Sequence, residues 1–364
     1  MIPMVDLKRQ YKILKAEIDA AIQGVLDNAQ FILGPNVAEL EKEIAQYHRV
    51  SHAVGVASGT DALLLSLRAC GIGAGDEVIT TPFTFIATAD VISLLSATPV
   101  FADITKDTFN IDPGKIEEKI TRKTKAIIPV HLFGHPADMD PICALAGKYN
   151  IRVIEDCAQA FGATYRGKKV GTRGDCGCFS FFPSKNLAGY GDGGMIITGN
   201  EDLAKNLRLL RNHGSSIKYH HATLGYNSRL DEIQAAIIRV KMKKIEEFND
   251  KRRINADIYR TLIKRDDIIL PVELPLCKHV YHQFTIRSKN RDGVINALQN
   301  ENVSSAVYYP VPLHRQEVFT RLNIRTENLT NSEMCAGEVL SLPMFPELEK
   351  GEIEHISNVI NHAP

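Results

Sequence analysis

Lys185 lies between an apolar aromatic segment and a glycine-rich one. It follows residues 178–182 (CFSFF), and residues 189–194 (GYGDGG) come shortly after it. A lysine at the end of a buried strand loses hydration, and this desolvation lowers the pKa of its amine. A neutral amine can form a Schiff base with a carbonyl compound. The segment therefore indicates either a reactive lysine or a solvated strand end before a flexible turn.

Two further groups of residues lie where predicted strands end. Residues 58–61 (SGTD) precede a helix rich in Ala and Leu, so the N–H group of Gly59 and the hydroxyl of Thr60 form a natural phosphate site, although any capped helix looks similar. Asp156 closes another strand, with Gln159 three residues later. Its carboxylate could hold a protonated ring nitrogen, bind magnesium or cap the next helix.

An aromatic residue and a polar segment complete the set. Phe85 follows a third strand and could stack on a flat ligand or pack in the core. Residues 225–229 (GYNSR) introduce a long predicted helix and could meet another loop or another chain. A phosphate site, a stacking aromatic, a strand-end carboxylate and a reactive lysine are together the groups that bind pyridoxal 5′-phosphate (PLP), which the protein orients and tunes.

Alternating strands and helices must position these groups. The segments with strand character are residues 53–57, 77–81, 98–103, 125–130 and 151–156. The segments with helical character between them are residues 60–70, 87–96 and 139–149. Apolar strands separated by helices predict an α/β fold with a mostly parallel sheet covered on both faces. Ligands bind at the carboxyl ends of the strands in such sheets.

The C-terminal third has a different pattern. Residues 229–263 have one sustained helical periodicity, long enough to bridge two domains. Prolines, a short strand at residues 282–286 and a helix at residues 293–301 follow. We therefore predict a large PLP-binding α/β domain with an N-terminal arm over residues 1–245, and a smaller α+β domain over residues 246–364.

The composition excludes several classes of protein. The 364 residues carry 43 basic and 43 acidic side chains, so no charge pattern indicates nucleic-acid binding. No apolar run approaches the roughly 20 residues that span a membrane, and the N-terminus becomes charged too early for a signal peptide. Seven scattered cysteines favour the reducing cytoplasm. Cys176 and Cys178 lack a second pair at zinc spacing, so we expect no metal site.

The chain resembles the DegT/StrS-type sugar aminotransferases, which are PLP-dependent transferases of the aspartate aminotransferase fold (fold type I). The resemblance runs nearly end to end, from residues 5–7 to residues 342–344. Its most specific motifs are residues 58–63 (SGTDAL), 153–159 (VIEDCAQ), 180–185 (SFFPSK), 191–194 (GDGG) and 227–235 (NSRLDEIQA).

This resemblance implies a role for each residue of the site. Lys185 would form the Schiff base with PLP, Asp156 would pair with the ring nitrogen, Gln159 would approach the ring hydroxyl, and Phe85 would stack on the ring. The implied phosphate ligands are Gly59, Thr60 and Ser180, with Asn227 reaching in from the neighbouring subunit of a homodimer. Glu155 points to the opposite face of its strand and is expected to be structural. We expect the glycine-rich loop to leave room for the cofactor and the sugar.

The implied reaction has two halves. L-Glutamate gives its amino group and leaves pyridoxamine 5′-phosphate, and a nucleotide-linked keto sugar then accepts that group, with Lys185 as the base. Relatives that are dehydratases have histidine at this position, so Lys185 favours transamination. The form of residues 227–231 resembles the branch acting on 3-keto sugars, either UDP-2-acetamido-3-keto sugars or dTDP-3-keto-6-deoxyhexoses. Such products serve amino-sugar, surface-polysaccharide (lipopolysaccharide or O-antigen) or glycoside biosynthesis.

Substrate contacts are expected from four residues. Arg229 would pair with a substrate carboxylate or diphosphate, or form an ion pair at the helix start. Tyr308, Tyr309 and His314 would lie near the sugar. Relatives that act on hexuronates commonly have histidine at the position of Tyr308, so Tyr308 disfavours a hexuronate substrate. The alternatives are a 4-keto nucleotide-sugar aminotransferase, a ketocyclitol aminotransferase and, in another class, a PLP-binding regulator without turnover.

Overall fold

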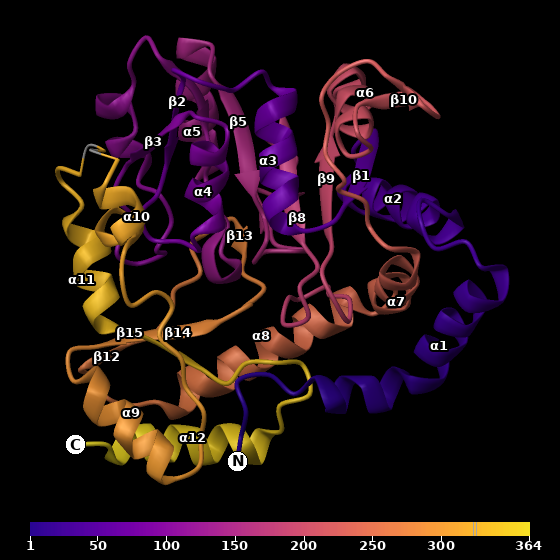
Figure 1. The fold of residues 1–364 in the computed structure, drawn as a ribbon. Helices are drawn as coiled ribbons and strands as arrows, with labels where there is room; N and C mark the ends of the chain where they lie inside the picture. Colours follow the sequence, from indigo (N-terminus) through magenta and orange to yellow (C-terminus); the bar gives the residue numbers. More distant parts are fainter. Residues whose placement is uncertain (323, 325) are drawn as a thin grey trace.

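The computed structural model describes residues 1–322, 324 and 326–364 and is built around a seven-stranded sheet (Figure 1). The strands of this sheet are β1 (His52–Val56), β2 (Glu77–Thr80), β3 (Thr98–Phe101), β4 (Thr124–Ile127), β5 (Arg152–Asp156), β8 (Cys176–Ser180) and β9 (Gly194–Thr198). Their order is β1-β9-β8-β5-β4-β2-β3. Within it β9 runs antiparallel to β1 and β8, and all other neighbours are parallel. The predicted mostly parallel α/β sheet is confirmed.

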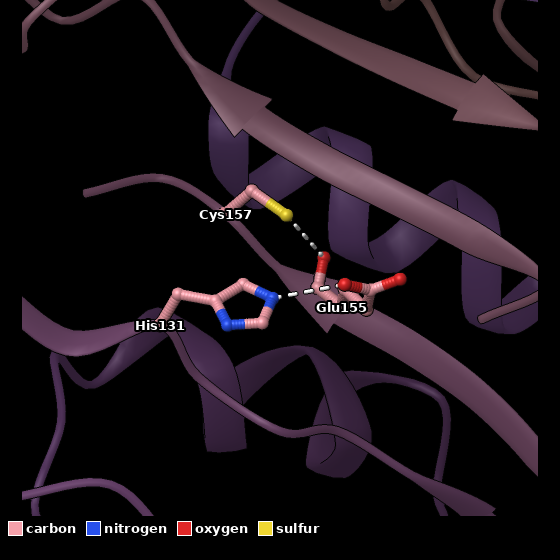
Figure 2. A group of neighbouring side chains, drawn as sticks. All are labelled: His131, Glu155 and Cys157. Carbon is pink, nitrogen blue, oxygen red and sulfur yellow. Dashed lines mark hydrogen bonds and ion pairs between the residues drawn. The ribbon is translucent and has the colours of Figure 1, made fainter. Parts of the chain in front are cut away.

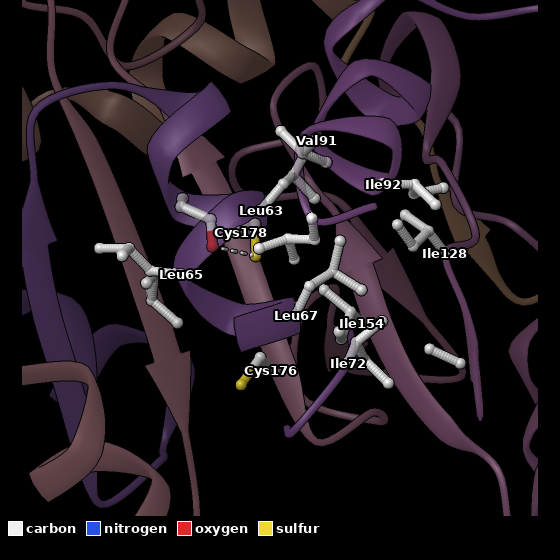
Figure 3. Close-up of a cluster of buried hydrophobic side chains, with 14 of the residues drawn as sticks. Leu63, Leu65, Leu67, Ile72, Val91, Ile92, Ile128, Ile154, Cys176 and Cys178 are labelled. Carbon is white, nitrogen blue, oxygen red and sulfur yellow. Dashed lines mark hydrogen bonds between the residues drawn. The ribbon is translucent and has the colours of Figure 1, made fainter. Parts of the chain in front are cut away.

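Helices cover both faces of the sheet, as alternation along the strands requires. In β9, Ile196 points into one core, whereas Met195 and Ile197 point into the other. The helices on the Ile196 face are α3 (Gly59–Ala69), α4 (Ala87–Leu94) and α6 (Glu201–Leu210). The helices on the opposite face are α2 (Pro35–His48), α5 (Met139–Tyr149) and α7 (Glu232–Met242). Figure 3 shows Leu63 and Leu67 of α3 close to the cysteines of β8.

A second core lies in the C-terminal part of the chain. Its sheet and helices are β12 (Ile268–Ile269), β14 (Phe284–Ser288), β15 (Val339–Leu342), α8 (Ile245–Leu262), α9 (Arg291–Asn300) and α12 (Lys350–His362). The strands pair antiparallel in the order β12-β14-β15. Ile2 and Val5 of the N-terminal arm pack against this core, and Ile2 also bridges Val303.

The helix predicted over residues 229–263 is two helices. Residues Lys243 and Lys244 separate α7 from α8, because Lys244 has φ −113° and ψ 0° and so leaves the helical region. The two halves then pack differently. Ile237 and Val240 of α7 lie against the N-terminal helix α1 (Leu7–Asn28), whereas Ala256 of α8 lies in the C-terminal core. The chain thus turns between the two cores, and the single periodicity did not reveal this break.

The remaining elements are short. They are β6 (Thr164–Tyr165), β7 (Lys168–Lys169), β10 (Ser215–Ile217), β11 (His220–His221), β13 (Cys277–Lys278), α10 (Glu317–Thr320), α11 (Thr330–Glu338) and 3₁₀ turns at Pro113–Lys115, Glu117–Lys119, Leu132–Gly134 and Leu313–Arg315. The β13 strand pairs with β6 and so joins the segment before β14 to the segment that follows β5. In the part of the chain described, no helix combines the length and the apolar character needed to cross a membrane.

The glycine-rich loop is filled by protein. A Cβ at Gly189 would lie 2.6 Å from Oε1 of Gln234 in α7, and the same oxygen accepts the N–H of Tyr190 at 2.7 Å. A Cβ at Gly194 would lie 2.2 Å from the carbonyl oxygen of Ser58. The expectation that these glycines leave room for cofactor and sugar is therefore wrong. They let the loop approach α7 and the start of α3.

Gly177 in β8 gives a test of this close packing. A Cβ there would lie 2.4 Å from the Cα of Gly171 and 2.6 Å from its carbonyl oxygen, and backbone atoms cannot move aside as a flexible side chain can. We expect Gly177→Ala to lower the free energy of unfolding by about 2 kcal/mol or more. Gly147→Ala is the matched control, since nothing lies within 4 Å of its added Cβ in α5. Equal urea midpoints for the two variants would contradict the packing.

Candidate active site

A cavity of about 470 Å³ lies at the carboxyl ends of the parallel strands. The segments that follow β1, β2, β4, β5 and β8 all contribute to its lining. Nine of the residues singled out from the sequence line it: Gly59, Thr60, Phe85, Asp156, Gln159, Ser180, Lys185, Tyr308 and Tyr309. The cavity has the size typical of small-molecule sites. Residues far apart in the sequence thus meet at one edge of the sheet.

Lys185 reaches this cavity from the loop after β8. Its backbone N–H donates to the carbonyl of Phe182 at 2.8 Å, which closes a turn and fixes the start of the side chain. Burial lowers the pKa of the Lys185 amine to about 8, and the charge of Asp156 acts in the opposite direction. About a tenth of the amine is therefore neutral and nucleophilic at pH 7, far more than for a lysine with the ordinary pKa.

Asp156 lies buried at the end of β5 and faces the same cavity. Its carboxylate accepts the hydroxyl of Thr88 at 2.9 Å and the N–H of Ala158 at 3.1 Å. Burial raises the pKa of Asp156, while these bonds and the charge of Lys185 oppose the rise. Among the described residues no cation forms an ion pair with it. A protonated ring nitrogen is the partner that such a carboxylate lacks.

Gln159 is held in one orientation by two neighbours. The N–H of Phe133 donates to its Oε1 at 2.8 Å, and its Nε2 donates to the hydroxyl of Tyr309 at 3.0 Å. Phe85 is 55% exposed, although it is a large apolar side chain in the lining of a cavity. Such a side chain is suited to covering the face of a flat ring.

The N-terminus of α3 provides the groups that a phosphate needs. The side chain of Ser58 caps the helix by accepting the N–H of Asp61 at 3.0 Å. The preceding N–H groups, of Gly59 and Thr60, have no partner among the described residues. A Cβ at Gly59 would lie 2.6 Å from the Cβ of Ser180, so only glycine lets the helix start approach the end of β8. Free N–H groups at a helix N-terminus bind anions.

The family model for the DegT/DnrJ/EryC1/StrS aminotransferases matches residues 12–361 of this chain. The chain belongs to this aminotransferase family. It is a PLP-dependent aminotransferase, and the lysine, the unpaired carboxylate and the free helix terminus fit that cofactor.

Individual relatives match over nearly their whole length. The chain is 51% identical to the UDP-N-acetyl-3-dehydro-α-D-glucosamine 3-aminotransferase of Acidithiobacillus ferrooxidans, covering 100% of this chain and 98% of the relative. It is 49% identical to a protein of Geobacillus stearothermophilus named pleiotropic regulatory protein, covering 98% and 96%. The crystal structure of Streptomyces venezuelae DesV in complex with a ketimine intermediate superposes with a TM-score of 0.96 at 43% identity, covering 99% and 97%.

Three residues expected in the site of the aminotransferase lie outside the cavity of their own chain. Asn227 bridges Asn212, and Arg229 donates to the Oδ1 of Asn212 at 3.2 Å. His314 is 1% exposed, and its Nε2 lies 2.9 Å from the carboxylate of Glu333. This placement corrects the expectation that His314 contacts the sugar in this cavity, because its ring is buried in a structural contact.

Some residues of the cavity lining were not found from the sequence. Thr88 lies inside a predicted helix, where nothing marks it as a ligand of Asp156. His282 and Gln283 come from the segment just before β14 and reach the cavity only because the C-terminal core packs beside it. Motif spacing does not reveal such a long-range contact.

A buried hydrogen-bonded cluster braces the strand that carries Asp156 (Figure 2). His131 Nε2 lies 3.0 Å from the carboxylate of Glu155, and the N–H of Ala137 donates to His131 Nδ1 at 2.9 Å. The proton of this ring is therefore on Nε2 and is donated to Glu155. The carboxylate also accepts three backbone N–H groups at 2.7 Å, from Gly171, Arg173 and Gly174.

This cluster is better suited to structure than to metal binding. His131, Glu155 and Cys157 place ligand atoms close together, but both ring nitrogens of His131 are occupied by hydrogen bonds. Burial favours a raised pKa for Glu155, but its hydrogen bonds from His131 and the backbone outweigh this and leave the pKa lowered. The backbone N–H of His131 also donates to the backbone carbonyl of Asp156 at 3.0 Å. The cluster thus fixes the end of β5 from the face opposite the cavity.

Replacing Glu155 tests this bracing. We expect Glu155→Gln to lower the free energy of unfolding at pH 7 by about 2 kcal/mol or more, because the amide turns its own N–H groups toward other donors. The folded-state pKa of Glu155 is lowered, so its contribution is complete above the unfolded value of about 4.3 and is lost as the pH falls through the folded value. Urea unfolding of both proteins at several pH values measures this contribution to the free energy of unfolding. The exposed Glu118→Gln is the control, and an equally small effect of both variants would contradict the bracing.

Proposed function

We propose that this aminotransferase moves an amino group from L-glutamate to C3 of a nucleotide-linked 3-keto sugar, with a UDP-2-acetamido-3-keto sugar as first choice and a dTDP-3-keto-6-deoxyhexose as second. The observation that carries the proposal is the meeting of Lys185, Asp156 and the free start of α3 in one cavity. The 3-aminotransferase of Acidithiobacillus ferrooxidans is 51% identical over 98% of its length, and this favours C3 over C4.

The residues of the chain divide the work between binding and proton transfer. Bound PLP supplies an electron sink for the charge that develops on the substrate carbon. Gly59, Thr60 and Ser180 would hold its phosphate, and Asp156 would keep its ring nitrogen protonated. Lys185 would hold the cofactor and, when released, would accept and return a proton at Nζ, for which its lowered pKa is suited.

The region beside Lys185 is suited to a sugar without a carboxylate. Tyr308, Tyr309 and Phe85 line it, and Tyr309 is fixed by the amide of Gln159 at 3.0 Å. These side chains offer hydroxyl groups and flat apolar faces to a sugar ring. Arg229, from a second subunit, would pair with the diphosphate. We therefore favour 2-acetamido-3-keto sugars without a carboxylate over the corresponding hexuronates.

A homodimer with shared sites is the second part of the proposal. Asn227 and Arg229 lie outside the cavity of their own chain, close in sequence to the β10–β11 pair. Large apolar side chains in that segment are exposed, with Ile217 at 69% and Leu224 at 84%. Exposed apolar groups of this size favour burial against another protein surface.

The seven cysteines are free thiols, which favours the cytoplasm as the compartment.

A regulatory role without turnover is the competing proposal, since one relative has a regulatory name. A regulator that binds PLP would also use the lysine and the carboxylate, so these two groups do not separate the two proposals. The 3-aminotransferase of Acidithiobacillus ferrooxidans is 51% identical over 98% of its length, which favours turnover. We therefore favour the enzyme.

A substrate panel tests the reaction. We expect PLP-loaded protein and L-glutamate to release 2-oxoglutarate with UDP- or dTDP-linked 3-keto sugars, and mass spectrometry to find the amino sugar. Lys185→Ala should lower the rate at least about 10⁴-fold, because the covalent and acid–base steps both need the amine. Turnover of 4-keto sugars or of a keto-inositol alone would identify the alternative substrates. No turnover with any acceptor would favour the regulator.

Mixing subunits tests the shared site. Lys185→Ala and Asn227→Ala should each be weakly active alone. If Asn227 serves the neighbouring subunit, a hybrid dimer has one site with both native residues and recovers about half of the native activity per dimer. If Asn227 serves its own subunit, neither site of the hybrid is intact and activity does not recover. The comparison requires co-expressed chains with different tags, purified over both.

A further inference from the structure

His282 is a buried residue of the cavity lining that has no place in the mechanism above. It is 5% exposed and enters the cavity from the segment before β14, next to Gln283. Lys185 lines the same cavity from the loop after β8. The residue that follows Lys185 is Asn186, and Nδ1 of His282 lies 3.2 Å from Oδ1 of Asn186. The imidazole of His282 is thus hydrogen-bonded to Asn186, the residue next to Lys185.

A chain of hydrogen bonds fixes the tautomer of this ring. Nδ2 of Asn249 donates to the carbonyl of Phe161 at 3.0 Å, so the oxygen of Asn249 is free to accept. Nδ2 of Asn186 donates to that oxygen at 2.8 Å and to the carbonyl of Val280 at 3.0 Å. Asn186 therefore presents its own oxygen to His282, and Nδ1 carries the ring proton. Nε2 is left with a lone pair.

The ring remains neutral. Burial lowers the pKa of His282 far below its ordinary value, and the charge of Lys185 acts in the same direction. Neither Nε2 of His282 nor Nζ of Lys185 has a hydrogen-bond partner among the described residues. An acceptor and a donor thus lie in one cavity, and the acceptor is held rigidly by the residue that follows the donor.

We propose that His282 is a positioning residue for Lys185: its Nε2 accepts a hydrogen bond from the Lys185 ammonium whenever the lysine is not bonded to PLP. This inference rests on the proposed function of Lys185. The ammonium would form when the amine takes a proton from one carbon, and it would be lost again when that proton is delivered to a second carbon, as the 1,3-proton shift of transamination requires. His282 keeps its protonation state throughout. Its effect is to stabilise the ammonium and to hold it beside the reacting carbon.

Two substitutions of His282 distinguish the role of Nε2 as an acceptor from the role of the hydrogen bond between Nδ1 and Asn186. His282→Asn keeps a donor where Nδ1 was and removes the acceptor at Nε2. His282→Gln keeps an acceptor near the position of Nε2 and loses the donor. The other charged groups near Lys185 are unchanged in both variants: Asp156 and Asp192 in the cavity, and Asp6, Arg252 and Glu347 around a small cavity behind the lysine.

The experiment follows the capture of PLP by apoprotein as a function of pH, by absorbance, because only the neutral amine adds to the aldehyde. The wild-type midpoint should lie near 8. We expect His282→Asn to shift it down by about one pH unit, since the ammonium loses an acceptor. Its kcat should fall about 10- to 100-fold with the KM for the keto sugar unchanged. His282→Gln should restore at least half of the shift.

The outcomes separate this inference from the proposed function. An unchanged midpoint in His282→Asn would overturn it, and so would equal shifts in both variants, because the bond to Asn186 would then be responsible. Thermal unfolding midpoints lowered equally in both variants would make the ring structural and overturn it as well. Failure of the wild-type apoprotein to capture PLP would instead contradict the proposed role of Lys185.

Discussion

The rest of the site depends on the buried carboxylate of Asp156, which has no cation of its own among the described residues. Burial raises its pKa, and the charge of Lys185 opposes this rise. The same charge pair moderates the lowering of the lysine's pKa to about 8. A protonated ring nitrogen of bound PLP would pair with this carboxylate and would leave the lysine amine available. The two titrations are thus coupled through one cavity, which is how a site combines acid and base chemistry near neutral pH.

The fold holds this carboxylate from two directions. On the cavity side, Thr88 and Ala158 donate to it at 2.9 and 3.1 Å. On the opposite face of β5, Glu155 is fixed by His131 and by backbone N–H groups, although a buried carboxylate is costly. Alternation along the strand lets Glu155 brace the sheet while Asp156, the next residue, faces the cavity. The buried cluster around Glu155 therefore serves to hold the end of β5 in place, and with it Asp156.

The sequence predicted the local features of the site and missed the distant ones. Gly59 starts α3, Asp156 ends β5 and Lys185 lies in the loop after β8, so the sheet brings all three to one edge. The sequence predicted Lys185 at the strand end itself, whereas β8 ends at Ser180. His282 and Gln283 were missed because they depend on how the C-terminal core packs. His314 was misplaced, since a motif position does not show that Glu333 holds its ring. The break at Lys244 was missed because both helices share one apolar period. The expected strand at residues 282–286 lies two residues later in the structure.

We expect Lys185 to be the residue that carries PLP. A second lysine, Lys241, is also buried with a pKa lowered to about 8, and it packs over the ring of Tyr190. Borohydride reduction of PLP-loaded protein, followed by tryptic digestion and mass spectrometry, distinguishes the two. We expect the pyridoxyl phosphate mass on the peptide that contains Lys185. The same mass on the peptide that contains Lys241, or on no peptide, would contradict it.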